Sequence, residues 1–559
     1  MQNISRPLAL VAGCVLFASL SMAQFGRGGG TWNTAGADAQ RDSWARTDNR
    51  ISAASMPGFS FLWKVKASNN AVQSWSLTSA VMVDSYIGYR GFRSYAFLGG
   101  ASNNAVALDT DLGRVEWTQN LGAVTPGTAA CPGGSLAGVT RATPLAPAAA
   151  PAGGGRGGAA AGRGGAASGV SEPGAGAITI GQGRGGGGGG GGRGASGGGG
   201  GGGRGASGGG RGGGGGGGAF GGSGGRGPAA PGGGRAPEAV YTVSADGLLH
   251  TLYISNGQDA KPPVRFLPAG ANASGVLLVD GVIYASTSGN CGGAPNGVWA
   301  IDTNATSPAA IHWASNGGGI AGTYGIALGS DGTVYAATSD GDYSPTAFSD
   351  SLVSLDAKIL KLKDWFTPGK SDFTSSPVVF QYKEKDLIAV ANKDGNLYLL
   401  DGAAIGGADH KTPLASAKIG FGADAGALAS WQDAAGTRWV LAGSGSAIVA
   451  LKVVDQNGKP SLQQGWTSGN IASPLPPIVI NGIVMTAASG AGSKPAVFYA
   501  LDGATGKELF NSGSTITAPT GRGSALAGSA GQVYLSTNDS TIYAFGIPLV
   551  PPDLAKKVQ

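Results

Sequence analysis

The chain has 559 residues, of which 107 are glycine and only 13% are charged. A typical soluble domain is about 25% charged and about 7% glycine, so this composition excludes a coiled coil, an acidic disordered chain and an ordinary helical enzyme. The formal net charge is +6, but residues 151–235 carry eight arginines and one acid and alone contribute +7. The rest of the chain is nearly neutral, and it gives no support for a nucleic-acid groove.

Residues 1–23 predict a secretory signal peptide. Arg6 supplies a positive start, residues 8–20 form an apolar run too short to span a membrane, and the small residues of 21–23 offer a cleavage site. An alternative is a lipoprotein box ending at Cys14, which would make that residue a lipid anchor. Both interpretations predict an exported protein in the periplasm or at the outer-membrane or extracellular side, with no transmembrane span.

Cleavage would leave two cysteines, Cys131 and Cys291. Because an exported protein meets an oxidising compartment, a disulfide between them is one expectation. The alternative is two separate buried thiols.

A recurring unit runs from residue 60 towards the end of the chain. It reads as an apolar strand, an Asp-Gly or Asn-Gly turn, a strand ending in a Leu-Asp type pair, a second turn and an aromatic residue, with its clearest copy at 498–510. The equivalent positions are 109, 253, 302, 356, 401, 452, 502 and 546. A period near 50 residues with four short strands per unit predicts an all-β, eight-bladed β-propeller.

The two ends of the repeat series are complementary. The last copy ends near Phe545 without its aromatic strand, whereas residues 61–65 form an aromatic strand that no unit precedes. We expect the N-terminal strand, including Trp63, to join the sheet that contains Tyr543 and so to close the ring. In this register Cys131 belongs to the second blade and Cys291 to the third, so a bridge between them is sterically conceivable.

The repeats divide the chain into segments. We expect a leader at 24–57, a propeller at 58–149 and 237–549, and a tail at 550–559. Residues 150–236 cannot bury enough apolar surface to fold, so we expect a disordered glycine-rich insertion in the second blade. Its Arg-Gly repeats are typical of RNA binding in other proteins, but export favours a flexible spacer or a weak contact with anionic surface polymer.

The repeat resembles that of the pyrroloquinoline quinone (PQQ) propellers, the quinoprotein alcohol dehydrogenase-like superfamily. The resemblance rests on Tyr499-Ala500-Leu501-Asp502, followed by Thr505-Gly506-Lys507-Glu508 and an aromatic residue, and on a leader similar to theirs at 32–41. It covers roughly 30–149 and 237–548. It implies either a PQQ-dependent alcohol or sugar dehydrogenase or a non-catalytic relative, such as an outer-membrane assembly lipoprotein.

The resemblance also implies a site. In the dehydrogenases PQQ lies between a tryptophan floor and a disulfide of two adjacent cysteines, a calcium ion is held by acidic and amide side chains, and an aspartate acts as base. This sequence has no adjacent cysteines and no Cys-x-x-Cys-His haem motif, and none of its acids matches the base or the calcium ligands. Candidates for the floor are Trp75, Trp299 and Trp431, and the alternative is that they staple blades together.

No other catalytic pattern stands out. His250, His312 and His410 are isolated, which predicts packed residues rather than zinc ligands. The repetition of an aspartate at one place in each unit favours turn capping over catalysis. The aspartates are Asp109, Asp302, Asp356, Asp401 and Asp502. The sequence therefore assigns no catalytic, cofactor-binding or metal residue.

Two functions remain. The first is an exported, monomeric binding or scaffold propeller for a protein, peptide or glycan partner, with no nucleic acid bound. The second is a periplasmic PQQ-dependent dehydrogenase with a divergent site, which would take PQQ with calcium.

Overall fold

The structure is a computed structural model. It describes residues 32–548 apart from 47, 49, 69–76, 89–90, 101, 125–126, 129–130, 132–135, 146–237, 421–424 and 522. The predicted signal peptide, Cys14, Trp75, the tail at 550–559 and the whole glycine-rich insertion at 150–236 lie outside these residues. Within the part that is described, we find no helix with the length and apolar character needed to cross a membrane.

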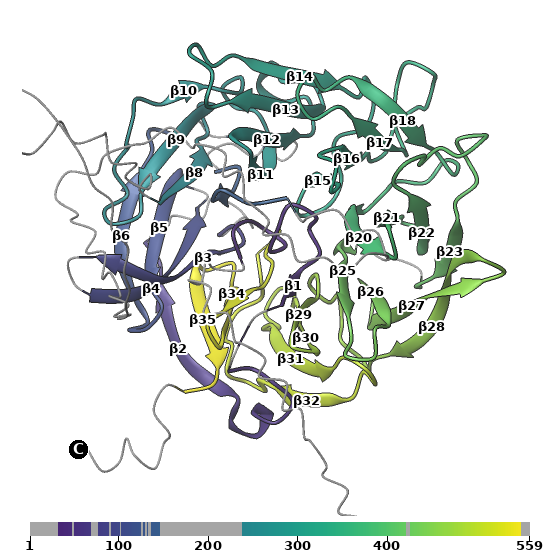
Figure 1. Cartoon of the computed structure of the whole chain (residues 1–559). Coiled ribbons are helices and arrows are strands. Elements are labelled where there is room, and N and C mark those ends of the chain that lie inside the picture. The colour runs from purple at the N-terminus through teal and green to yellow at the C-terminus, as the bar shows by residue number, and fades with distance from the viewer. Residues whose placement is uncertain are drawn as a thin grey trace, which may run out of the picture.

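Eight sheets, one for each expected blade, surround a central axis (Figure 1). Each has four antiparallel strands, and one of them gains a fifth, parallel strand, β1 (Trp44–Ala45). Numbered in chain order, the first blade contains β3 (Val81–Gly88), β4 (Gly91–Gly99), β5 (Asn104–Asp109) and β6 (Arg114–Asn120), and the second contains β7 (Val139–Thr140), β8 (Ala239–Val243), β9 (Leu248–Tyr253) and β10 (Val264–Arg265). The third blade contains β11 (Ala273–Val279), β12 (Val282–Thr287), β13 (Gly297–Asp302) and β14 (Ala310–Ala314). The fourth contains β15 (Ala327–Leu328), β16 (Val334–Ala337), β17 (Leu352–Leu355) and β18 (Leu362–Phe366).

The other four blades complete the ring. The fifth blade contains β20 (Val378–Tyr382), β21 (Lys385–Ala391), β22 (Asn396–Asp401) and β23 (Ala415–Lys418), and the sixth contains β25 (Ala429–Gln432), β26 (Arg438–Gly443), β27 (Ile448–Gln456) and β28 (Lys459–Thr467). The seventh blade contains β29 (Ile478–Ile480), β30 (Ile483–Ala488), β31 (Val497–Asp502) and β32 (Glu508–Asn511). The eighth contains β33 (Ala527–Ser529), β34 (Gln532–Ser536), β35 (Thr541–Gly546) and β2 (Ser60–Lys66). Short elements outside this scheme are β1 (Trp44–Ala45), β19 (Ser375–Ser376), β24 (Gly426–Ala427) and the 3-10 turns η1 (Met56–Gly58) and η2 (Cys291–Gly293). The predicted eight-bladed propeller is confirmed.

The N-terminal strand closes the ring as expected. β2 runs antiparallel to β35, with Trp63 opposite Ala544 and Lys64 opposite Tyr543. The last blade is therefore built from both ends of the described chain. The glycine-rich insertion lies between β7 and β8, so it interrupts the second blade, and the sheet resumes at Ala239 as the sequence predicts.

The core lies between neighbouring blades rather than at one centre. One cluster joins Val378 and Leu387 of the fifth blade to Val440 and Leu451 of the sixth, and all four side chains are buried. The strands need Val, Leu and Ala on both faces because each sheet packs against a neighbour on either side. This demand explains the low charge of the sequence.

Outer strands also carry tryptophans that lie on glycines of the following blade. A Cβ atom at Gly113, Gly257 or Gly506 would lie 2.6, 2.6 and 2.4 Å from the rings of Trp63, Trp117 and Trp466 respectively. The indole Nε1 of Trp466 donates to the carbonyl of Gly503 at 2.9 Å, and that of Trp117 donates to the carbonyl of Ile254 at 2.8 Å. These contacts form an outer girdle, which we define as the three tryptophan–glycine pairs.

The girdle predicts unequal effects of two glycine substitutions. Gly506 and Gly458 have similar positive φ values, +72° and +77°, but nothing lies within 4 Å of a Cβ at Gly458. We expect Gly458→Ala to lower the free energy of unfolding by about 1 kcal/mol through backbone strain alone. Gly506→Ala should cost roughly 2 kcal/mol more because its methyl group meets the indole. Urea unfolding of both variants checks this, and equal losses would contradict a role for the girdle.

Candidate functional site

The leader lies at the centre of the ring, where Figure 1 places β1 among the innermost strands. In order along the chain, its residues hydrogen-bond to successive blades. The backbone carbonyls of Trp32, Ala39, Gln40, Asp42 and Ser43 accept from the amides of Met82, Leu328, Val379, Ser430 and Val479, in the first, fourth, fifth, sixth and seventh blades, at 2.8–3.0 Å. Asn33, Thr34 and Asp48 bond to Arg141, Val276 and Gly531 and thereby supply the contacts to the second, third and eighth blades.

These contacts define the hub, which is the described part of residues 32–51 bound to inner strands, or to residues next to them, in all eight blades. An inner strand has one edge that faces the axis, and its amides there need acceptors. The leader carbonyls supply them, and β1 extends this pairing by running parallel to β29, with Trp44 opposite Val479. The leader is therefore a structural part of the propeller rather than an appendage.

Arg41 is the central side chain of the hub. It is 1% exposed, and its guanidinium donates from Nε to the carbonyl of Ile326 at 2.9 Å, from Nη2 to that of Gly275 at 3.1 Å and from Nη1 to Thr34 Oγ1 at 2.8 Å. Burial lowers the pKa of Arg41 to about 10, against the opposing effect of Asp38. Because its donors are directed to the protein's own oxygens, Arg41 joins the third and fourth blades to the leader.

A second charged group lies on the leader close to β1. Asp42 forms an ion pair with Arg46, and Arg46 also lies 3.2 Å from Asp38. The guanidinium groups of Arg46 and Arg438 lie 4.5 and 5.7 Å from the ring centre of Trp44. Burial, followed by the repulsion of Asp38, raises the pKa of Asp42 well above its usual value. These two carboxyls therefore have cationic partners already and do not form an open acidic cluster.

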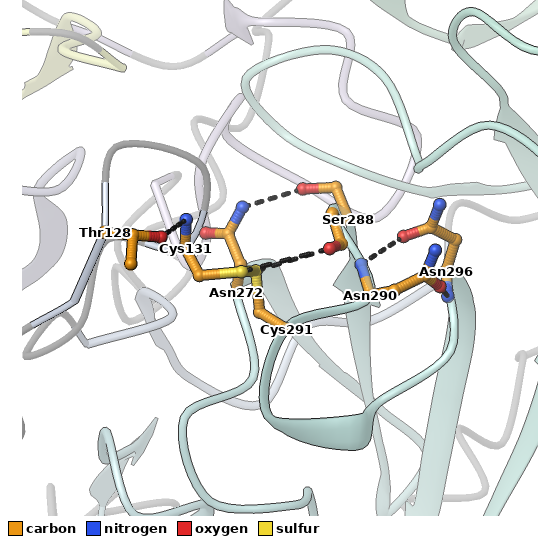
Figure 2. Close-up of a disulfide and its surroundings, with 8 residues drawn as sticks. Thr128, Cys131, Asn272, Ser288, Asn290, Cys291 and Asn296 are labelled. Atoms are coloured by element: carbon orange, nitrogen blue, oxygen red, sulfur yellow. Dashed lines mark hydrogen bonds between the residues drawn. A yellow bond between two sulfur atoms is a disulfide. The ribbon is translucent and has the colours of Figure 1, made fainter.

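The two cysteines are joined by a disulfide (Figure 2). Cys131 lies on the connection from β6 to β7, and Cys291 opens η2 in the third blade, with 160 residues between them in sequence. The bridge therefore links the connection before the second blade to the third blade. In sequence, the glycine-rich insertion lies between the two cysteines. Around it, Asn272 donates to Ser288 Oγ at 2.9 Å and the amide of Asn290 donates to Asn296 Oδ1 at 2.9 Å.

The candidate floor tryptophans lie far apart in the ring. Trp299 is buried on β13 of the third blade and stacks on His312, at 4.5 Å between ring centres. Trp431 is buried on β25 of the sixth blade and stacks on Trp439 at 6.4 Å. Both are held within sheets or between blades, which agrees with the stapling interpretation. Trp75 is outside the described residues.

The prediction that His250 is isolated was wrong, because its partner lies nine residues further along. His250 Nδ1 lies 3.0 Å from Asp259 Oδ2, and its Nε2 lies 3.1 Å from Ser244 Oγ. This order of groups is that of a hydrolase triad, but Ser244 is 4% exposed and its hydroxyl also hydrogen-bonds to Asp246 and to the carbonyl of Leu248 in its own turn. The chain of hydrogen bonds fixes the β8–β9 hairpin.

The other histidines and the recurrent aspartates are structural. His410 is not isolated either, because its Nδ1 lies 3.2 Å from Asp364 Oδ1, and its ring stacks on Trp365 with 3.8 Å between ring centres. Each recurrent aspartate accepts, through Oδ1, a backbone amide two or three residues further on, as expected for turn caps. The donors are the amides of Leu112 for Asp109, Asn304 for Asp302, Lys358 and Ile359 for Asp356, Ala403 for Asp401, and Ala504 and Thr505 for Asp502.

The described residues do not fit the PQQ and calcium site that the family resemblance implies. The disulfide joins cysteines from two loops, and the two described tryptophan candidates lie in separate blades. The hub carboxylates already have partners, since Asp38 and Asp42 contact Arg46 and Asp48 accepts backbone amides. A calcium ion bound beside a quinone needs several free oxygen ligands that converge. The hub instead offers Arg41, which donates four hydrogen bonds to oxygens of the protein. No reaction step of this chain is therefore assigned to PQQ or to a calcium ion beside it.

The fold is that of quinoprotein alcohol dehydrogenases. The quinohemoprotein alcohol dehydrogenase from Comamonas testosteroni superposes with a TM-score of 0.52 at 11% identity, over 92% of this chain and 80% of that one. The corresponding enzyme ADHIIG from Pseudomonas putida HK5 gives 0.52 at 11% identity, over 94% and 82%. A europium-containing methanol dehydrogenase gives 0.51 at 10% identity, over 92% and 98%.

Sequence comparison adds no closer assignment, since no family model and no curated protein matches the chain. The resemblance to PQQ-repeat propellers is thus confirmed for the fold. At these sequence identities, the structural similarity shows only that the folds are alike.

Removal of the Arg41 side chain should loosen the hub. Arg41→Met would leave the buried carbonyls of Ile326 and Gly275 without donors, and we expect a loss of about 3 kcal/mol or more in the free energy of unfolding. A matched control is Arg265→Met, because Arg265 is exposed and also donates to carbonyls, those of Asp246 and Leu267. Water can replace those bonds, so the control should lose under about 1 kcal/mol. Comparable losses in urea unfolding would refute the structural weight given to Arg41.

The disulfide should stabilise the ring by restricting the unfolded chain. We expect the double substitution Cys131→Ser with Cys291→Ser to lower the free energy of unfolding by about 2–4 kcal/mol. Reduction of the wild-type protein with dithiothreitol should reproduce this loss, whereas the double variant should not respond to reductant. A wild-type stability that is unchanged by reductant would show that the bridge contributes little.

Proposed function

We propose that this chain is an exported binding or scaffold propeller that holds a protein partner on its loops. The observation that carries the proposal is the hub: the centre of the ring is used to bind the chain's own leader, and the guanidinium of Arg41 donates four hydrogen bonds to oxygens of the protein there. A propeller whose centre is used in this way interacts with other molecules through its hairpins and faces. The predicted signal peptide supports export.

An apolar hairpin tip favours a protein or peptide over a glycan. The first two strands of the first blade, β3 and β4, have 8 and 9 residues, compared with 7 and 6 for β11 and β12 of the third blade. Near the tip, Ile87 and Phe92 are cross-strand partners and are 47% and 64% exposed. Two large apolar side chains next to each other on a protruding hairpin are typical of a protein contact.

The alternative, a PQQ-dependent dehydrogenase with a divergent site, is supported by the likeness in fold to two alcohol dehydrogenases and a methanol dehydrogenase. The two functions make opposite predictions. The purified full chain, incubated with PQQ and CaCl2, should show no stoichiometric change in quinone absorbance and no dye-linked oxidation of simple alcohols or sugars. Binding with turnover would overturn the scaffold proposal in favour of the enzyme.

A positive test uses the hairpin tip. We expect a photoreactive phenylalanine analogue in place of Phe92 to give a discrete protein adduct when the chain is expressed in its source organism. The matched control carries the same analogue at Ile359, which is 65% exposed on a turn of the fourth blade. A protein partner predicts an adduct at position 92 that is absent at 359, and no adduct at 92 would count against this surface.

A further inference from the structure

Three aspartates converge on one face of the fourth blade. One carboxylate oxygen from each of Asp340, Asp350 and Asp372 lies within 4.8 Å of the other two. Asp340 and Asp350 belong to the loop between β16 and β17, and Asp372 belongs to the connection from β18 to β19. The hydrogen bonds that define the hub involve none of these three residues.

Asp350 is the distinctive member of this cluster. It is 1% exposed, and its Oδ1 atom is buried without a hydrogen-bond partner. Its backbone has a φ of +51°, and its amide donates to the carbonyl of Ser339 at 3.2 Å, so the residue is held in place by the fold. A buried carboxylate oxygen without a donor requires a proton or a cation.

The charges around the cluster leave it with an excess of acid. Lys393 Nζ lies 3.7 Å from Asp372 Oδ2, and Lys370 Nζ lies 3.9 Å from Asp342, at the edge of the same loop. Both lysine side chains are largely exposed. Burial, followed by the repulsion of Asp372 and Asp340, raises the pKa of Asp350 to about 6, while Lys370 opposes the shift. The three carboxyls therefore repel one another when all are ionised.

We propose that Asp340, Asp350 and Asp372 bind one calcium ion, which ties the β16–β17 loop to the segment that leads into the fifth blade. Two oxygens bound to the same ion can be separated by at most twice the metal–oxygen distance. That limit is about 4.6–5.2 Å for Ca²⁺, and the three oxygens, which lie within 4.8 Å of one another, are compatible with it. Three carboxylates favour calcium, because Mg²⁺ is usually bound through one or two carboxylates and keeps several waters. Waters would complete the six to eight ligands that calcium usually takes.

The proposal does not depend on whether the propeller is a scaffold or an enzyme, because the ion would join two loops and none of its three ligands belongs to the hub. The functional consequence is a rigid loop surface on this face of the fourth and fifth blades. Calcium in the exterior or periplasmic space would keep that surface ordered, and its removal would loosen the two loops that it joins.

The test uses the full chain after treatment with EDTA and buffer exchange. Calorimetric titration with CaCl2 should show one site per chain that is absent in Asp350→Asn. The Tm should rise by about 2 °C or more at saturating CaCl2, with a weaker response to MgCl2. Asn accepts a positive φ and keeps the shape of the side chain, so this variant should fold. Asp342→Asn is the matched control, because Asp342 is fully exposed on the same loop and outside the cluster, and this variant should retain the site.

A wild-type chain that gives no heat and no shift in Tm with CaCl2 would mean that the carboxyls share a proton only, and it would overturn the proposal. Calcium binding that persists unchanged in both Asp350→Asn and Asp372→Asn would place the ion elsewhere and would overturn it too. Equal responses to CaCl2 and MgCl2 would contradict the preference for calcium.

Discussion

The propeller depends on the hydrogen bonds between leader carbonyls and the inner edges of its blades. Each inner strand has amides that face the axis, and residues 32–51 pass close to all eight blades in sequence order. The same leader also buries the guanidinium of Arg41 among carbonyl oxygens. Pairing of these groups removes the cost of unsatisfied polar atoms at the centre, and it links blades that otherwise contact only their neighbours.

The periphery uses a different interaction for the same purpose. Tryptophans of outer strands lie on glycines of the next blade, and β2 closes the ring by pairing with β35. The disulfide adds a covalent link between two loops that lie on either side of the glycine-rich insertion in sequence. The blades are thus held together at the centre by backbone pairing and at the rim by packing. The loops and hairpin tips that remain take no part in these contacts, and they are the places where we propose that a partner binds.

The architecture was predictable from sequence because it repeats. Pairs such as Leu355-Asp356 and Leu501-Asp502 recur at one place in each unit, and a ring follows from their spacing. The course of the leader was not predictable, since its contacts use backbone carbonyls, which leave no pattern of side chains. Asp350 and its two partners were missed for a related reason: they come from irregular loops with no fixed spacing. The Asp259 partner of His250 was hidden by the turn after β9.

The division of the last blade between the two ends of the chain has a consequence for biosynthesis. A ribosome makes the leader and β2 early, yet β35, the strand that β2 pairs with, ends only at Gly546. The leader's amide partners are made one blade at a time, the last of them at Gly531, and the partner strand of β2 is made later still, so the early segments remain incompletely paired until the last blade is synthesised. Assembly should therefore be late and concerted, as expected where most contacts join residues distant in sequence, and nascent chains that stop before Gly546 would be ready substrates for proteases and chaperones.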